Sequence, residues 1–294
     1  MRISLAIAGP KASAVDYARF GGVIVKAWVY AEQHFALPRC YNGKPEYGGA
    51  PGLHRTDSCE TWVRSCAVLG QPAIGTCEPI PEDADGYAFI DVEAWSPDMS
   101  RPTPDALAAR TLVRTHYERS GMSVLECDRL FANSARACLI GILEAAKAAR
   151  PNVRWGHWSY PHWDGDLAAI EPVLDRCDIG TLANYPHYWL VEDKPDMPGE
   201  QHYSTADAAN KYRYTKVLTR FMPRGPIIGT TALRCLAAGP YKGRFLDALN
   251  IEHRITYTRS LGCEAVIAWY EAYTDQHVEE LYRYAADVLI PAIS

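Results

Sequence analysis

The segment Phe89–Pro97, which reads FIDVEAWSP, carries the pattern that decides the fold and the chemistry expected of this chain. Residues Tyr87–Val92 are largely aromatic or β-branched and are bounded on both sides by turn-forming residues, which predicts a short buried strand. Side chains two residues apart on a strand point to the same face. Asp91 and Glu93 are therefore expected side by side, with Trp95 next along that face.

Two carboxylates at this spacing suggest acid–base chemistry. They cannot both ionise freely, so the pKa of one of them is expected to rise toward the working pH. A protonated Glu93 beside an ionised Asp91 is what general-acid cleavage of a glycosidic bond requires. The alternative interpretation is a strand that ends in two solvated acids, because the pattern D-x-E also occurs by chance.

The composition is that of an ordinary soluble globular protein. The chain has 294 residues, of which 48% are hydrophobic and 22% are charged, and this length fits one large α/β barrel or two small domains. The formal net charge of −5 and the scattered lysines and arginines argue against a nucleic-acid partner. The sequence leaves the oligomeric state open.

Nothing in the sequence predicts a metal ion or another cofactor. The 9 cysteines are spread along the chain without a C-x-x-C pair, and no spacing of cysteines and histidines matches a zinc site. The cysteines are expected to be free thiols, with Cys138 a small core residue of an apolar helical stretch.

Membrane insertion is not expected, because no apolar run approaches the roughly 20 residues that cross a bilayer. The apolar stretch Ile3–Ala8 is short and is followed at once by Gly9, Pro10 and Lys11. It is expected to be the first strand rather than part of a secretory signal. We therefore expect synthesis in the cytoplasm, and the sequence leaves open release by lysis, as part of a virus particle or by another export route.

Strand-like and helix-like segments alternate along the whole chain. The expected strands are Ile3–Ala8, Gly22–Val29, Tyr87–Val92, Val153–Trp158, Ile179–Ala183, Pro226–Thr230 and Ala265–Trp269. The expected helices are Pro104–Ser120, Glu126–Ala149 and Gln276–Leu289. Such alternation implies parallel strands joined by right-handed crossovers. We predict one catalytic domain over residues 1–294, a single distorted TIM-like (β/α) barrel of about 7–8 parallel strands with outer helices and with its chemistry at the carboxyl ends of the strands.

Four segments, in the same order, resemble the hyaluronidase family of glycoside hydrolases (family 56). Phe89–Pro97 is similar to that family's I-D-x-E-x-W-x-P, and Asn42–Pro51 to its G-x-P-x-x-G-G-x-P loop. Ala149–Gly156 is similar to the family's R-P-x-x-x-W-G, and Leu261–Trp269 to its G-A-x-G-V-V-x-W. The resemblance extends from about Gly22 through nearly the whole chain.

The resemblance implies a retaining endo-glycosidase that cleaves a polysaccharide without an enzyme nucleophile. In that mechanism the 2-acetamido oxygen of the sugar attacks its own anomeric carbon, which departs from the usual scheme of two carboxylates. Glu93 matches the general acid/base, and Asp91 matches the acid that orients the acetamido group. The residues expected to bind substrate are Tyr30, Trp95, Trp158, Tyr160, His162, Tyr188, Trp189 and Trp269.

The expected pocket departs from the family at several positions. Where the family has W-G-x-Y-x-F-P-D-C-Y, residues 155–163 read WGHWSYPHW. Trp158 replaces a tyrosine that holds the acetamido group and offers an N–H but no hydroxyl, and His162 replaces an acid. The family's second pocket tyrosine aligns with Trp189 or, one residue off, with Tyr188. A substrate less anionic than hyaluronan is therefore expected.

Aromatic residues are concentrated in three segments of the chain. About half of them are expected to pack the barrel, while those at strand ends suit stacking on sugar rings. They are Trp155, Trp158, Tyr160, Trp163, Tyr185, Tyr188, Trp189, Trp269, Tyr270 and Tyr273.

Two other functions remain open. A cell-wall muramidase of the barrel lysozyme type also carries a D-x-E strand, but it leaves the segments Asn42–Pro51 and Ala149–Gly156 unexplained. A non-catalytic carbohydrate-binding or receptor-binding barrel is compatible with the replacements at Trp158 and His162. A screen of polysaccharides with purified protein separates these alternatives.

Overall fold

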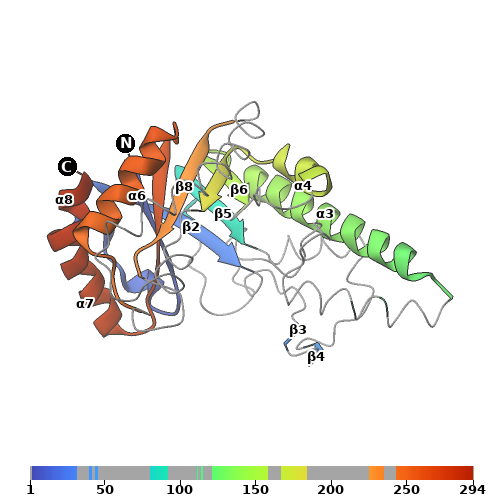
Figure 1. Ribbon diagram of the computed structural model, residues 1–294, viewed down its shortest axis with the longest axis horizontal. Coiled ribbons are helices and arrows are strands. Elements are labelled where there is room, and N and C mark those ends of the chain that lie inside the picture. Colours follow the sequence, from blue (N-terminus) through green and yellow to red (C-terminus); the bar gives the residue numbers. More distant parts are fainter. Residues whose placement is uncertain are drawn as a thin grey trace. The chain divides into compact units, whose positions relative to one another are not determined.

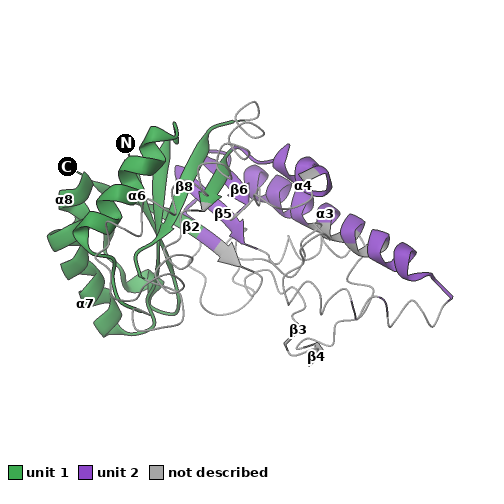
Figure 2. Cartoon of the chain, in the orientation of Figure 1, with its two compact units in different colours: residues 1–28, 179–294 green, residues 29–178 purple. Residues whose placement is uncertain are grey.

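The computed structural model describes residues 2–31, 40–41, 44–45, 80–91, 111, 114, 121–157, 167–183, 225–234 and 243–293. The chain divides into two compact units (Figure 2). Unit 1 comprises Met1–Trp28 and Ile179–Ser294, and unit 2 comprises Val29–Asp178. That residues 1–294 form a single catalytic domain remains a prediction.

Seven strands form one sheet with the hydrogen-bonded order β6-β5-β2-β1-β9-β8-β7. The recorded pairs β1–β2, β1–β9, β5–β6, β7–β8 and β8–β9 are all parallel. Each strand coincides within a few residues with a segment expected from the sequence. The strands are β1 (Arg2–Ala8), β2 (Ile24–Ala31), β5 (Gly86–Asp91), β6 (Val153–His157), β7 (Gly180–Ala183), β8 (Ile227–Ala232) and β9 (Ala265–Glu271).

The helices confirm two expected segments and add others (Figure 1). The expected helix over residues 104–120 lies outside the described residues, apart from helical Thr111 and Arg114. A two-stranded antiparallel ladder joins β3 (Cys40–Tyr41) and β4 (Lys44–Pro45). The helices are η1 (Ala12–Ala14), η2 (Tyr17–Phe20), α3 (Val124–Ala149), α4 (Leu167–Leu174), α6 (Ala248–Ser260), α7 (Asp275–Tyr284), η7 (Ala285–Leu289) and α8 (Ile290–Ile293).

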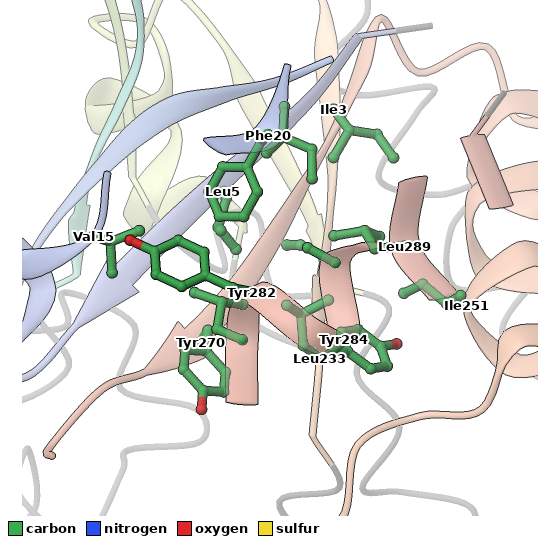
Figure 3. Packing of buried hydrophobic residues seen from close by; sticks show 14 of the residues in the cluster. Ile3, Leu5, Val15, Phe20, Leu233, Ile251, Tyr270, Tyr282, Tyr284 and Leu289 are labelled. Atoms are coloured by element: carbon green, nitrogen blue, oxygen red, sulfur yellow. The ribbon is translucent and has the colours of Figure 1, made fainter. Parts of the chain in front are cut away.

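One face of the sheet in unit 1 packs against its helices. Ile3 pairs with Val266 and Leu5 with Ala268, so these four side chains lie on the same face of β1 and β9. They join a buried cluster with residues of α6, α7 and η7, including Ile251, Tyr282 and Leu289 (Figure 3). Burial of this apolar face, at roughly 25 cal/mol per Å², is the main force that holds the helices on the strands.

Within unit 1, an ion pair links the segment that follows β8 to α7. Arg234 Nη2 lies 2.5 Å from Glu280 Oε2 and donates to the Tyr270 hydroxyl at 3.0 Å. The Tyr270 hydroxyl in turn donates to the carbonyl oxygen of His277 at 2.8 Å. Gln276 Nε2 donates to Glu280 Oε1 at 2.8 Å. The pKa of Glu280 is lowered from its ordinary value of 4.5, mainly by this hydrogen bond and then by the hydrogen bond and the charge of Arg234.

Unit 2 is built on the long helix α3, whose first turn is fixed by a capping box. The Ser123 side chain accepts from the Glu126 backbone N–H, and the Glu126 carboxylate accepts from the Ser123 backbone N–H. Further along, Arg136 Nε donates to the carbonyl oxygen of Ala169 in α4 at 2.9 Å. The helix pair α3–α4 therefore packs as one block with β6.

No helix in the described ranges combines the length and the apolar character needed to cross a membrane. Three described cysteines, Cys127, Cys177 and Cys263, are buried free thiols. Burial raises the pKa of Cys177 and of Cys263 to about 12. At neutral pH these two groups are protonated, so they are packing residues rather than nucleophiles.

Candidate active site

In unit 2, the carboxyl end of β5 presents Asp91. The strand ends at this residue, and alternation puts its side chain on the face of Phe89 rather than on that of Ile90. Asp91 is half-buried, and its Oδ1 atom is fully buried. The sequence expectation that Asp91 ends a buried parallel strand is therefore confirmed, whereas Glu93 lies outside the described residues and the shared face of the two carboxylates stays a prediction.

The register of the neighbouring strand β6 with β5 determines the sheet face on which His157 lies. Ile90 pairs in parallel with His157, and Ala88 pairs with Trp155. His157 and Trp155 therefore lie on the face of Ile90, opposite to that of Asp91. The backbone of His157 also hydrogen-bonds the Cys177 thiol. His157 is buried on the packing side of β6 and does not contribute its imidazole to the face that carries Asp91.

In unit 1, β9 presents Trp269 on the face opposite to the helix-packed core. Its register partners are Ala6 on β1 and Ala232 on β8, so a methyl group stands beside the indole on each neighbouring strand. Trp269 itself is half-buried. Small neighbours on both sides favour contact between the indole and a flat ligand, and this arrangement suits stacking against a sugar ring.

The end of β9 extends past Trp269 to Glu271, which the sequence reasoning did not include. Glu271 is exposed and lies on the face of Trp269, because the two residues are two positions apart on the same strand. Tyr273 is also exposed and donates its hydroxyl to Glu271 Oε2 at 3.2 Å. Partial desolvation of its hydroxyl, followed by the charge of Glu271, raises the pKa of Tyr273. An acidic residue two positions beyond the aromatic residue is the signal that could have revealed this group.

The aromatic residues separate into packing and exposed groups. Trp155 is fully buried and donates Nε1–H to the carbonyl oxygen of Arg150 at 3.4 Å. Tyr270 is buried in the core of unit 1, with its ring 5.5 Å from that of Phe245. Both are barrel packing, as expected for part of the set. Trp269 and Tyr273 are the described members that solvent reaches.

Most of the expected site lies outside the described residues. For Tyr30 the structure describes only its place in β2. Among the described residues, no group of three or more histidines, cysteines, aspartates and glutamates could hold a metal ion. The expected site residues that the structure does not describe are Glu93, Trp95, Trp158, Tyr160, His162, Tyr188 and Trp189.

The comparisons with known proteins point to one class, the hyaluronidases. A region of the chain is 25% identical over 178 residues to human hyaluronidase-3, covering 55% of this chain and 42% of that protein. Another is 26% identical over 134 residues to mouse hyaluronidase PH-20, covering 39% of this chain and 26% of that protein. The chain thus spans less than half the length of the curated relatives it matches. No protein-family model matches.

The solved structures define the fold. The monoclinic crystal structure of bee venom hyaluronidase has a TM-score of 0.70 at 14% identity, covering 99% of each chain. The structure of that enzyme in complex with a hyaluronic acid tetramer has a TM-score of 0.73 at 13% identity, covering 99% of this chain and 98% of that one. The expected (β/α) barrel is therefore confirmed, and the protein is hyaluronidase-like in fold and in sequence.

Proposed function

We propose that this protein is a retaining endo-glycosidase that cleaves a polysaccharide containing 2-acetamido sugars. The observation that carries the proposal is the position of Asp91 at the carboxyl end of a buried parallel strand, in a fold shared with bee venom hyaluronidase. In barrels of this class the chemistry takes place at that end of the strands. Glu93 follows two residues after Asp91, and on an extended strand this spacing would bring the two carboxylates to one face.

Glu93 is assigned the role of general acid and base. It protonates the leaving glycosidic oxygen and then deprotonates the water that opens the cyclic intermediate. The substrate's own acetamido oxygen is the nucleophile, so no second enzyme carboxylate needs to form a covalent bond. Asp91 accepts the acetamido N–H and holds the oxygen against the anomeric carbon. Its negative charge also raises the pKa of Glu93, which keeps the general acid protonated.

Trp269 is assigned to the wall of the sugar pocket. It lies between two alanines of adjacent strands, where an indole can cover the apolar face of a hexose. Tyr30, Trp95, Trp158, Tyr160, His162, Tyr188 and Trp189 are proposed as the remaining substrate contacts.

The test is a screen of purified protein against polysaccharides, with new reducing ends as the measurement. Hyaluronan, chondroitin, chitin oligosaccharides and bacterial envelope polysaccharides are the substrates. Glu93→Gln is expected to lower kcat by a factor of about 10²–10⁴ while the unfolding transition stays in place. Wild-type turnover by this variant would refute the assignment.

A non-catalytic carbohydrate-binding barrel is the second candidate. It is favoured by Trp158 and His162, which differ from the residues of the resembled family at these positions. Binding of a glycan by the wild-type chain, without new reducing ends for any polysaccharide, would establish this function instead. A muramidase would be recognised by release of reducing ends from bacterial cell walls alone.

A further inference from the structure

The carboxylate of Glu271 has no role in the proposed chemistry, yet it lies on the face that carries Trp269. Glu271 is the last residue of β9 and pairs with Ala8, the last residue of β1. It is exposed, so its charge faces solvent where the two strands end. A ligand that stacks on Trp269 therefore passes close to a negative charge two positions further along the strand.

The charge of Glu271 is not neutralised within the described part of the chain. Its recorded partner is the Tyr273 hydroxyl, which is a neutral donor. Lys11 is the cation on the adjoining turn. Its Nζ atom lies 2.7 Å from Asp275 Oδ1, so it is paired with another carboxylate. Tyr273 is 53% exposed, so its ring adds apolar surface beside the charge. The result is an aromatic surface with one net negative charge at its edge.

Backbone contacts hold the end of β9 that carries Glu271. Lys11 N–H donates to the carbonyl oxygen of Ala272 at 3.0 Å, and Ala272 N–H donates to that of Ala8 at 2.8 Å. Gly9 has φ 95°, and a Cβ at this position would lie 2.6 Å from the Ala272 oxygen, so the two turns touch backbone to backbone. Tyr273 N–H donates to His277 Nδ1 at 3.2 Å. These contacts fix the backbone position of Glu271, so its charge stays near the ends of β1 and β9.

We propose that Glu271 is a specificity-determining residue that makes the Trp269 surface select neutral 2-acetamido glycans over glycans that carry uronic acids. This inference rests on the proposed glycosidase function and adds the residue that sets its substrate class. A uronate carboxylate near Glu271 is repelled, whereas the hydroxyl groups of a neutral sugar donate to it. For exposed like charges a few ångströms apart the repulsion corresponds to about a 5-fold loss of affinity, which salt screens.

The experiment compares the binding of two oligosaccharides by isothermal titration calorimetry, in low-salt and in high-salt buffer. Chitin oligosaccharides are the neutral probe, and hyaluronan oligosaccharides of equal length are the anionic probe. Glu271→Gln removes the charge and keeps the shape of the side chain. Glu252→Gln is the matched control, because Glu252 is an exposed residue of α6 outside the strand ends.

Glu271→Gln is expected to tighten hyaluronan binding about 5-fold in low salt, with the gain lost in high salt. Chitin binding is expected to stay nearly the same, because the amide oxygen of glutamine still accepts from the sugar hydroxyl groups. Glu252→Gln is expected to change neither. Binding of chitin oligosaccharides by the wild type, with equal hyaluronan affinity in wild type and Glu271→Gln, would overturn this inference and leave the proposed function standing. Absence of binding of both probes to wild type and variant alike would also overturn this inference, while the proposed function is tested separately by the screen for new reducing ends.

Discussion

The methyl group of Thr258 in α6 occupies the space where residue 229 of β8 would carry a Cβ atom. Position 229 is glycine, and Gly229 pairs with Val266 on the helix-packed face of the sheet. Thr258 is itself buried, so its methyl group has little room to withdraw. The close approach of α6 to β8 therefore depends on the absence of a side chain at one position.

Gly229→Ala is expected to lower the free energy of unfolding by about 1–3 kcal/mol, because the added methyl group overpacks this contact. Gly141→Ala in α3 is the control: nothing lies within 4 Å of an added Cβ there, and alanine favours a helix. Chemical denaturation measures both. Thr258→Ser removes the opposing methyl group and should restore much of the loss in the double variant, whereas no rescue would point to a different cause.

Trp269 and Trp155 are expected to respond differently to substitution. Trp269→Ala should weaken glycan binding at least about 10-fold and leave the unfolding midpoint nearly unchanged, because the residue is half-buried on the sheet face opposite to the helix-packed core. Trp155→Phe should lower the free energy of unfolding by about 1–3 kcal/mol without changing glycan affinity, because it opens a cavity in a closed core. Calorimetry and thermal unfolding of both variants distinguish these roles, and equal effects on binding would contradict the assignment of Trp269.

Asp91→Asn is expected to lower the rate and to move the upper limb of the pH–rate profile to lower pH. Loss of the neighbouring negative charge lowers the pKa of Glu93, so the general acid deprotonates earlier as the pH rises. Asp85→Asn, which removes an exposed carboxylate before the other end of the same strand, is the control. An upper limb that stays in place would mean that the two carboxylates are not coupled.

Glu280→Gln is expected to lower the thermal stability at neutral pH but to have a smaller effect in acid. The pKa of Glu280 is lowered in the folded chain, so its contribution is present above the ordinary value of 4.5 and is lost as the pH falls through the folded value. The difference in Tm between wild type and variant should therefore shrink below pH 4.5. A difference that stays constant over this range would show that the ion pair with Arg234 does not stabilise the fold.

The strands could be predicted from the sequence because apolar β-branched runs leave few other possibilities. The helices were harder to predict from the sequence. The buried face of α6 contains Asn250, Arg254 and Thr258, so the apolar stripe that reveals an amphipathic helix is interrupted by polar residues. Helix α4 is only 8 residues long and contains Pro172, which argues against a helix when the sequence is considered alone.

The site was predicted in part, for a related reason. The positions of Asp91 and Trp269 at the ends of strands follow from the apolar runs that precede them, and their roles in a site remain predictions. The role of Glu271 depends on how far β9 continues, and that length is set by pairing with β1 as far as Ala8, which the sequence does not reveal. The finding that His157 lies on the sheet face opposite to that of Asp91 likewise depends on the register of His157 with Ile90. Register is a property of two strands together, so a single segment cannot disclose it.

The parallel pairing of β1 with β9 has a consequence for synthesis on the ribosome. Unit 1 is made from the two ends of the chain, whereas unit 2 is one continuous stretch. Residues Arg2–Ala8 leave the exit tunnel early but obtain their β9 neighbours only when Ala265–Glu271 have been made. Contacts between such distant segments form slowly, because a long loop must close first. We therefore expect the helix block of unit 2 to become protected from proteases in nascent chains before unit 1 does.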